Sequence, residues 1–276
     1  MFHELQIFEN PEAILLVASI IFFFSIIAGK AGFRFGLPAL LLFLGVGMLF
    51  GSDGLGIQFS NPSAAQFIGM LALSIILFSG GMDTKMSEIK PIATEGVVLA
   101  TVGVLLTTLI TGGFIYYVFL WSTGYETLTV AESMLMAAVM SSTDSASVFS
   151  ILRSKGVYLK QRLRPTLELE SGSNDPMAYM LTLLIIAYIQ VGGMNLQEAV
   201  LQLLVQLSVG AIAGFLLGKL AVLMINKINM DNESLYPILL LTTAFFTFSA
   251  TTLCKGNGYL AVYIAGLVVG NAKIVH

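Results

Sequence analysis

Four carboxylates lie within or beside strongly apolar stretches of the chain, where an ionised side chain is costly unless it has a function. Asp144 belongs to the stretch AESMLMAAVMSSTDSASVFSILR. Glu168, Glu170 and Asp175 belong to the stretch TLELESGSNDPMAYMLT. The other Asp and Glu residues fall at the ends of apolar stretches or in the polar segments between them. In such a setting, the chemistry to expect of the four is the binding of an ion or a proton.

Short hydroxyl side chains surround Asp144 in the sequence, namely those of Ser141, Ser142, Thr143, Ser145 and Ser147. Such side chains compete for backbone hydrogen bonds and can satisfy a helix that has unwound, and broken helices hold ion sites near the membrane midplane. Hydroxyls also join membrane helices with no ion involved. The carboxylate among them favours the ion site, and the plain helix interface stays open as an alternative.

The second stretch supplies complementary groups. Ser171, Asn174 and Asp175 are spaced so that they share one face of a helix, and Glu170 shares a neighbouring face with Asn174. A hydroxyl, an amide and two carboxylates would therefore meet on one side of this helix.

Pro176 has no amide hydrogen, so it is expected to leave the carbonyl oxygen of Gly172 free beside Asp175. Hydroxyl, amide, carboxylate and carbonyl oxygens are hard ligands that suit an alkali cation or a proton. A single carboxylate that holds either one, but not both, is the minimum device for exchange. Because Asn174 adds an amide and no second charge, a one-for-one, electroneutral exchange is the simpler prediction.

The whole chain is suited to a membrane. It has 276 residues, of which 57% are hydrophobic and only 11% charged, and its mean hydropathy is +0.89. A membrane helix needs about 20 mostly apolar residues. The sequence predicts an all-α polytopic membrane protein with nine such segments, at 11–30, 35–51, 64–82, 92–120, 132–153, 166–190, 197–225, 235–253 and 257–272.

Lys and Arg residues predict the orientation of these segments. Of the thirteen, all but Lys255 fall on one side of a nine-segment alternation. The positive-inside rule then places the N-terminus outside the cytoplasm and the C-terminal end inside. Glu95 and Glu132 stand near the starts of the fourth and fifth segments, where a carboxylate favours a helix N-terminus.

Several motifs together resemble a known family. SSTDSASVFS at 141–150 is similar to the Thr-Asp motif of the monovalent cation/proton antiporters, and ELESGSNDP at 168–176 is similar to their Glu-Ser-x-x-Asn-Asp motif. GNGYLAVYIAGLVVGN at 256–271 and GLPALLLFLGVGMLFGSDGLG at 36–56 resemble their Gly-rich spans. The likeness covers essentially the whole chain and points to the NhaP-type potassium/proton antiporters of bacterial cell-volume regulation.

The resemblance implies roles for the candidate residues. Asp175 would be the principal carrier of cation and proton, and Asp144 would be a second carboxylate near the ion. Ser171 and Thr143 would be direct ligands. The bound metal would be the transported potassium or sodium ion, and no other cofactor is expected.

The neighbouring residues would support this site. Asn174 would brace an unwound part of the fifth segment, and Glu170 would pair with a basic residue in a later span. Gly172 and Pro176 would shape the backbone, although Pro176 stands where many family members have glycine. Glu168 matches no part of the shared motif and is expected at the cytoplasmic edge.

The resemblance also implies the architecture. Family members fold from inverted repeats with a broken helix, here expected in the fifth segment, and the GxxxG pairs Gly47/Gly51 and Gly266/Gly270 occur in segments of opposite orientation. Residues 1–276 are therefore expected to form one exchanger domain that stops before the second repeat is complete. Such spacing is also common in plain close packing of helices, as expected for the glycines of the seventh segment.

The resemblance and the composition also indicate which partners and which alternative functions to expect. A homodimer in the bacterial inner membrane is expected, with no nucleic acid, because a cytoplasmic loop suffices to explain the basic run RSKGVYLKQRLR. Enzyme activity is not expected, since the histidines His3 and His276 stand at the chain ends and no phosphate-binding motif is present. A cation channel and a non-transporting scaffold or fragment remain the alternatives.

Overall fold

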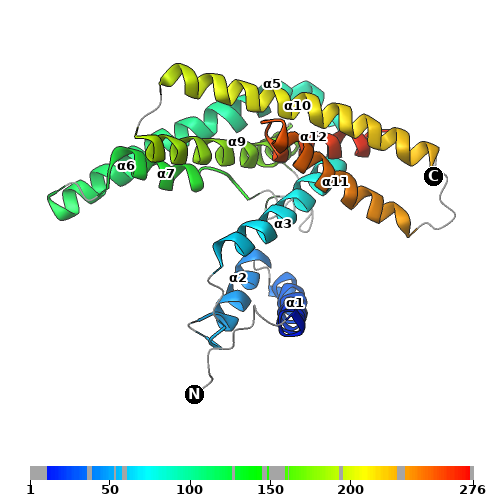
Figure 1. Ribbon diagram of the computed structural model, residues 1–276, viewed down its shortest axis with the longest axis horizontal. Helices are drawn as coiled ribbons and strands as arrows, with labels where there is room; N and C mark the ends of the chain where they lie inside the picture. Colours follow the sequence, from blue (N-terminus) through cyan, green and yellow to red (C-terminus); the bar gives the residue numbers. More distant parts are fainter. Residues whose placement is uncertain are drawn as a thin grey trace. The chain divides into compact units, whose positions relative to one another are not determined.

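The computed structural model describes residues 11–35, 39–52, 54–57, 61–125, 128–144, 148, 159–160, 162–192, 195–228 and 234–273. All regular structure within these residues is helical (Figure 1). The helices are α1 (Pro11–Phe35), α2 (Ala39–Phe50), α3 (Pro62–Asp83), α4 (Met86–Ile89), the 3₁₀ turn η2 (Lys90–Ile92), α5 (Ala93–Val98), the π-helical segment η3 (Leu99–Gly103), α6 (Val104–Thr123), α7 (Val130–Val139), α9 (Leu163–Val191), α10 (Leu196–Lys227), α11 (Leu235–Leu253) and α12 (Gly258–Gly270).

Five helical stretches among the described residues are both long and apolar enough to cross a membrane, namely Glu12–Lys30, Pro62–Asp83, Met86–Thr123, Gln197–Lys227 and Leu235–Leu253. α2, α7 and α12 are apolar but shorter. α9 has the length, with 29 residues, but its first half carries charged side chains. The prediction of an all-helical membrane protein is confirmed, and the count of nine spans stays a prediction.

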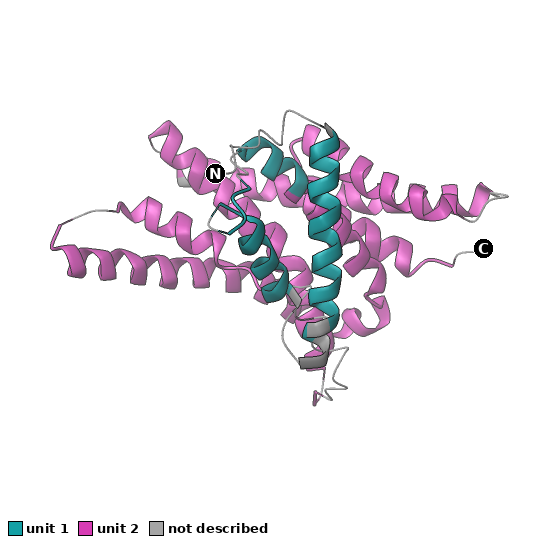
Figure 2. Cartoon of the chain, turned by 90° about the horizontal axis from the view of Figure 1, so that it is seen from below, with its two compact units in different colours: residues 1–68 teal, residues 69–276 magenta. Residues whose placement is uncertain are grey.

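The chain forms two compact units, residues 1–68 and 69–276 (Figure 2). In the first unit α1 packs on α2, and the rings of Phe24 and Phe50 lie 5.7 Å apart between centroids. The second unit contains all the candidate site residues. Its α9 contacts α5, η3, α7 and α12.

Glycines bring α12 close to its neighbours in the second unit. A Cβ atom on Gly266 would overlap the carbonyl of Phe78, and one on Gly270 would overlap that of Met82, both on α3. On α10, Gly210, Gly214 and Gly218 face Asn257, Ala261 and Ala265 in the same way. The expectation that the α10 glycines serve close packing is confirmed, and the GxxxG pair of α12 has the same use here.

The fourth predicted segment begins earlier than expected. Helical structure starts at Met86 rather than at residue 92, because Pro91 is accommodated in the 3₁₀ turn η2 instead of ending the helix. Further along, η3 inserts a π-helical turn between α5 and α6. Such turns widen a helix locally and are frequent at functional sites.

The start of α7 is marked by a capping box, and its end lies before the hydroxyl-rich segment. Thr129 caps it in a capping box with Glu132, which confirms the predicted role of Glu132 at a helix start. The helix ends at Val139, and the described residues 141–144 are not helical. Ser145, Ser147 and the basic residues Arg153 and Lys155 lie outside the described residues, so the broken helix stays a prediction.

Candidate ion site

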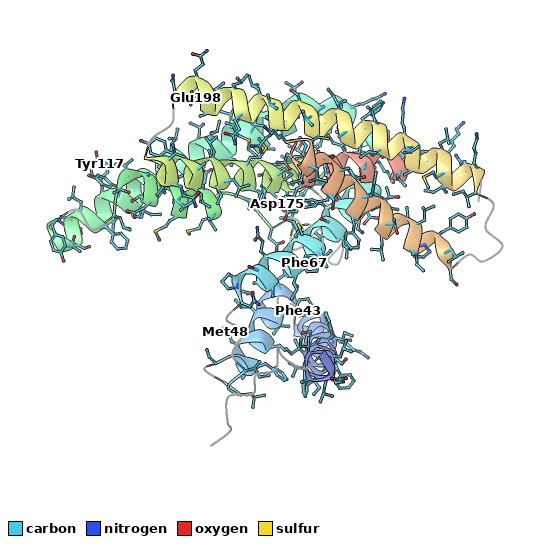
Figure 3. The ribbon with its side chains drawn as sticks, viewed as in Figure 1. Phe43, Met48, Phe67, Tyr117, Asp175 and Glu198 are labelled. Atoms are coloured by element: carbon cyan, nitrogen blue, oxygen red, sulfur yellow. The ribbon has the colours of Figure 1, made fainter. Side chains whose placement is uncertain are left out.

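α9 carries most of the predicted site residues. It continues through Pro176 without ending, and Ser171, Gly172, Asn174 and Pro176 are all buried along it. Asp175, labelled on α9 in Figure 3, is half-buried. The predicted helix face is therefore turned inward.

The residues of α9 meet the hydroxyl of Thr143. The side-chain amide of Asn174 donates to Thr143 Oγ1 at 2.6 Å and to Glu170 Oε1 at 2.8 Å. Thr143 Oγ1 also lies 2.9 Å from Ser171 Oγ and 3.3 Å from Glu170 Oε2. The structure thus brings together four predicted residues, and Asn174 joins α9 to the non-helical segment after α7.

Asp175 lies beside the same segment. The hydroxyl of Ser142 forms a hydrogen bond with the Asp175 carboxyl group, and Asp144 and Glu170 are near enough to repel its negative charge. Carboxylates that repel one another favour the uptake of a cation or a proton. The buried Oδ1 atom of Asn174 has no partner among the described residues, so an acceptor remains next to this cluster.

A cavity of about 430 Å³ opens onto the cluster. Its walls are η3, the start of α6, residues 140–143 and the first half of α9, including Glu170. Ser141, Ser142 and Thr143 all contribute to the wall. The sequence contains no pattern that assigned η3 to this site, because a π-helical turn has no residue signature of its own.

Gly172 is required for close packing. A Cβ atom there would come within 2.9 Å of the Tyr263 ring.

The carbonyl of Pro176 accepts a hydrogen bond of 3.0 Å from the side-chain amide of Asn257. Sequence reasoning missed Asn257. Its place before an apolar helix marks it as an N-cap, but nothing in the sequence pairs it with Pro176.

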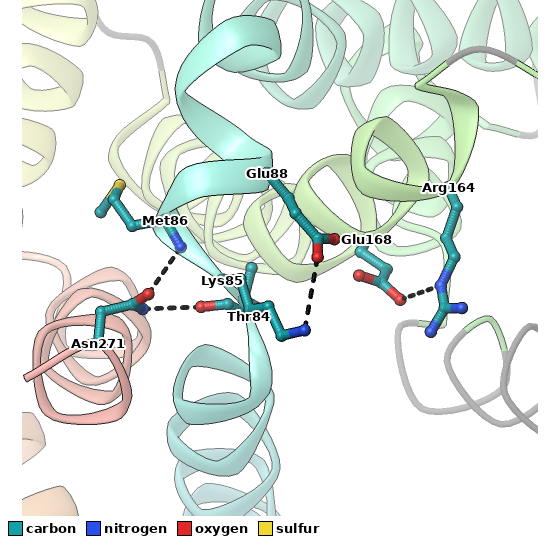
Figure 4. A network of polar contacts seen from close by, with 7 residues as sticks. All are labelled: Thr84, Lys85, Met86, Glu88, Arg164, Glu168 and Asn271. Carbon is teal, nitrogen blue, oxygen red and sulfur yellow. Dashed lines mark hydrogen bonds and ion pairs between the residues drawn. The ribbon is translucent and has the colours of Figure 1, made fainter.

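Glu168, which was expected at the cytoplasmic edge, is buried, with 8% of its surface exposed. Its Oε1 atom accepts a hydrogen bond of 3.1 Å from Arg164 Nε, one helical turn earlier (Figure 4). Burial is possible because this partner compensates the charge.

Nearby, the side chain of Asn271 joins the end of α12 to the turn between α3 and α4. Its Oδ1 atom accepts a hydrogen bond from Met86 N, and its amide group donates one to Thr84 O (Figure 4).

Replacing Asn257 by aspartate is expected to destabilise the protein by about 1–3 kcal/mol. Aspartate still accepts from the amide of Leu260 as an N-cap, but it cannot donate to the carbonyl of Pro176. Thermal unfolding in detergent measures the change. Asn195→Asp is the matched control, since Asn195 is an exposed N-cap that accepts from Gln197 N. Equal shifts for both variants would contradict the role assigned to the Pro176 bond.

Comparisons with known proteins show to which family the chain belongs. The sodium/hydrogen exchanger, transmembrane family model matches residues 12–276. The K(+)/H(+) antiporter NhaP of Alkalimonas amylolytica is 38% identical over 267 residues, which are 96% of this chain and 45% of that protein. The K(+)/H(+) antiporter NhaP2 of Shewanella oneidensis is 36% identical over 266 residues, 95% of this chain and 45% of that one. The chain thus spans less than half the length of these relatives.

A solved structure shows the same fold. The sodium proton antiporter MjNhaP1 from Methanocaldococcus jannaschii superposes with a TM-score of 0.73 at 24% identity, over 93% of this chain and 61% of that one. The family match over nearly all of the sequence agrees with the paired motifs on α9 and after α7. The chain therefore belongs to the sodium/hydrogen exchanger family.

Proposed function

We propose that this chain binds and carries the ions in an antiporter that exchanges a monovalent cation for protons across a membrane. The observation that supports this most is the grouping of Asp175 with Asp144, Glu170 and the hydroxyl of Ser142. A group of carboxylates within a bundle of membrane helices favours the binding of a cation or a proton that balances its charge.

Asp175 is the proposed carrier. It holds a proton in one half of the cycle and a cation in the other, and the two compete for the same oxygens. Thr143 and Ser171 provide neutral ligands, and Asp144 attracts the cation. Because Asn174 contributes no charge, one cation exchanges for one proton and the cycle is electroneutral. Movement between inward and outward access couples the two fluxes.

Potassium is the favoured cation and sodium the second choice. Two relatives are named K(+)/H(+) antiporters, and a probable Na(+)/H(+) antiporter of Methanocaldococcus jannaschii is 27% identical over 263 residues. Potassium and sodium differ in the cavity size and the number of oxygens that they require. The preference therefore rests on the higher identity to the potassium proteins.

The finer architecture belongs to the same proposal. The nine predicted segments cross the bacterial inner membrane as one exchanger domain over residues 1–276, with the N-terminus outside and the C-terminal end in the cytoplasm. The fifth segment is broken near Asp144. The protein forms a homodimer and uses no cofactor besides the transported ion.

Everted membrane vesicles test the proposal. A pH-sensitive dye reports proton movement when potassium and then sodium are added, and a potential-sensitive dye reports charge movement. An antiporter gives cation-dependent, saturable proton exchange with no change in potential, and Asp175→Asn removes it. Exchange that changes the potential would contradict electroneutrality, current without proton coupling would indicate a channel, and a flat trace from inserted protein would indicate a non-transporting chain.

A further inference from the structure

The turn of α9 that carries Asp175 is weaker than an ordinary helical turn. Pro176 stands inside α9 and has no amide hydrogen, so the carbonyl of Gly172, one turn earlier, loses its usual partner. Glycine weakens a helix interior further, because it restricts the backbone least. Asn174 and Asp175 lie between these two positions. The part of α9 that presents the ion ligands therefore needs support from outside the helix.

α12 contacts both ends of this weak turn. At Gly172, the ring of Tyr263 lies so close that a Cβ atom would come within 2.9 Å of it. At Pro176, the carbonyl oxygen accepts a hydrogen bond of 3.0 Å from the side-chain amide of Asn257. One steric contact and one hydrogen bond thus bracket the stretch of α9 that contains Asp175.

The side chain of Asn257 has little freedom to turn away from Pro176. Asn257 is buried, and its Oδ1 atom accepts a hydrogen bond of 2.9 Å from Leu260 N as the N-cap of α12. Its backbone N donates to the carbonyl of Gln206 on α10 at 3.0 Å. A Cβ atom on Gly210 would come within 2.8 Å of the Asn257 carbonyl oxygen, so α10 is in close contact here. This one residue therefore joins α9, α10 and α12.

Tyr263 is held equally firmly. Its side chain is buried in the main hydrophobic core, together with Leu77 and Phe78 of α3. α12 itself is fixed, because close glycine contacts join it to α3 and to α10. A side chain in such a close-packed interior cannot move without disturbing its neighbours. α12 is consequently a rigid support, and the weak turn of α9 is what it supports.

We propose that Asn257 and Tyr263 are positioning residues of the ion site. They hold the weak turn of α9 so that Asn174 and Asp175 keep their contacts with the non-helical segment after α7. They act on the backbone of α9 and not on the ion. Precise placement matters because a binding site loses affinity when its ligands move by more than about 0.5 Å. The ion that is bound and its exchange rest on the proposed function.

Asn257→Ser tests the hydrogen bond to Pro176. Serine can still cap α12 by accepting from Leu260 N, but its side chain is too short to reach Pro176. In everted vesicles, the half-saturating cation concentration is expected to rise about three- to tenfold, from the net energy of one hydrogen bond. The maximal rate per inserted protein is expected to change less than about twofold. A purely structural role would instead reduce the number of active molecules, and hence the maximal rate, at unchanged half-saturation.

Asn271→Ser is the matched control at the other end of α12. Asn271 accepts from Met86 N and donates to Thr84 O and Leu267 O, and none of these bonds goes to α9. Its replacement is expected to lower the unfolding temperature in detergent and to leave the half-saturating concentration unchanged. An equal rise in this control would overturn the proposal, because any loosening of α12 would then have the same effect.

Two substitutions of Tyr263 test the steric contact. Tyr263→Phe keeps the ring that packs on Gly172 and is expected to leave half-saturation unchanged. Tyr263→Leu removes the ring and leaves space into which the turn can move, so the half-saturating concentration is expected to rise at least about threefold. If this variant does not fold, Asn257→Ser decides alone. Unchanged half-saturation in Asn257→Ser would overturn the proposal.

A binding measurement separates this proposal from the proposed function. A bound cation raises the unfolding temperature of the purified chain, and the concentration required reports its affinity without transport. Weaker binding in Asn257→Ser than in Asn271→Ser, in a chain that shows no exchange, would support the positioning role and contradict the proposed function. Exchange with equal half-saturation in all variants would support the function and overturn the positioning role. No stabilisation of the unmodified chain by potassium or sodium would also overturn it, because no cation would then be bound.

Discussion

Asp175→Asn is expected to reduce cation-dependent proton exchange to background while leaving the protein folded and in the membrane. Asparagine has nearly the same shape as aspartate and keeps a contact with the hydroxyl of Ser142, but it can neither bind a proton nor carry a negative charge. Losing a charged ligand costs about 3 kcal/mol, which alone corresponds to roughly a 100-fold loss of binding. Without a titratable carrier, the exchange itself cannot take place.

The measurement compares initial rates of dye recovery in everted vesicles at equal protein content. Glu88→Gln is the control, because Glu88 is an exposed carboxylate that lies 3.6 Å from Lys85 in a surface ion pair. Such a pair contributes little to the stability of the protein. Asp144→Asn provides an intermediate test, since Asp144 acts on Asp175 through its charge. It is expected to weaken the binding of both the cation and the proton at Asp175, because it removes a negative charge that favours the uptake of either one. Full exchange in Asp175→Asn would exclude Asp175 as the carrier.

Gly266→Val is expected to prevent stable folding of the second unit. The added side chain would overlap the carbonyl of Phe78 on α3, and the neighbouring Gly270 meets Met82 on the same helix. Backbone atoms cannot rotate away as a flexible side chain can, so α3 and α12 would have to separate. Overpacking of a well-packed interior costs about 1–3 kcal/mol, and more where backbone must move. Tyr263 and Leu267, which line the same contact, would lose their packing too.

Gly113→Val is the matched control for this substitution. Gly113 is also helical, but a Cβ atom there has no neighbour within 4 Å. Valine at that position is expected to have little effect or to stabilise slightly, because glycine is a poor helix former. Size-exclusion chromatography and thermal unfolding in detergent measure the outcome. Similar unfolding temperatures for the two variants would contradict the close contact between α3 and α12.

The sequence by itself was enough to predict that the protein lies in a membrane, that its secondary structure is helical and which residues form most of the candidate site. Long apolar stretches predict membrane helices because the backbone must satisfy its hydrogen bonds internally in lipid. The spacing of Ser171, Asn174 and Asp175 predicted a shared face of α9, since helix periodicity is a local property. Glu132 predicted a helix start for the same reason. The resemblance to the antiporter motifs then connected α9 with Thr143, which spacing alone cannot do.

Only the tertiary structure decided which distant groups meet. The bond from Asn257 to Pro176 joins residues 81 positions apart, and the contact of Gly266 with Phe78 joins two helices far apart in the sequence. The burial of Glu168 and the place of η3 in the wall of the cavity beside the ion site depend on packing in the same way. Sequence periodicity specifies which side of a helix is polar or small, whereas the partner of that side is set by the mutual fit of all the helices.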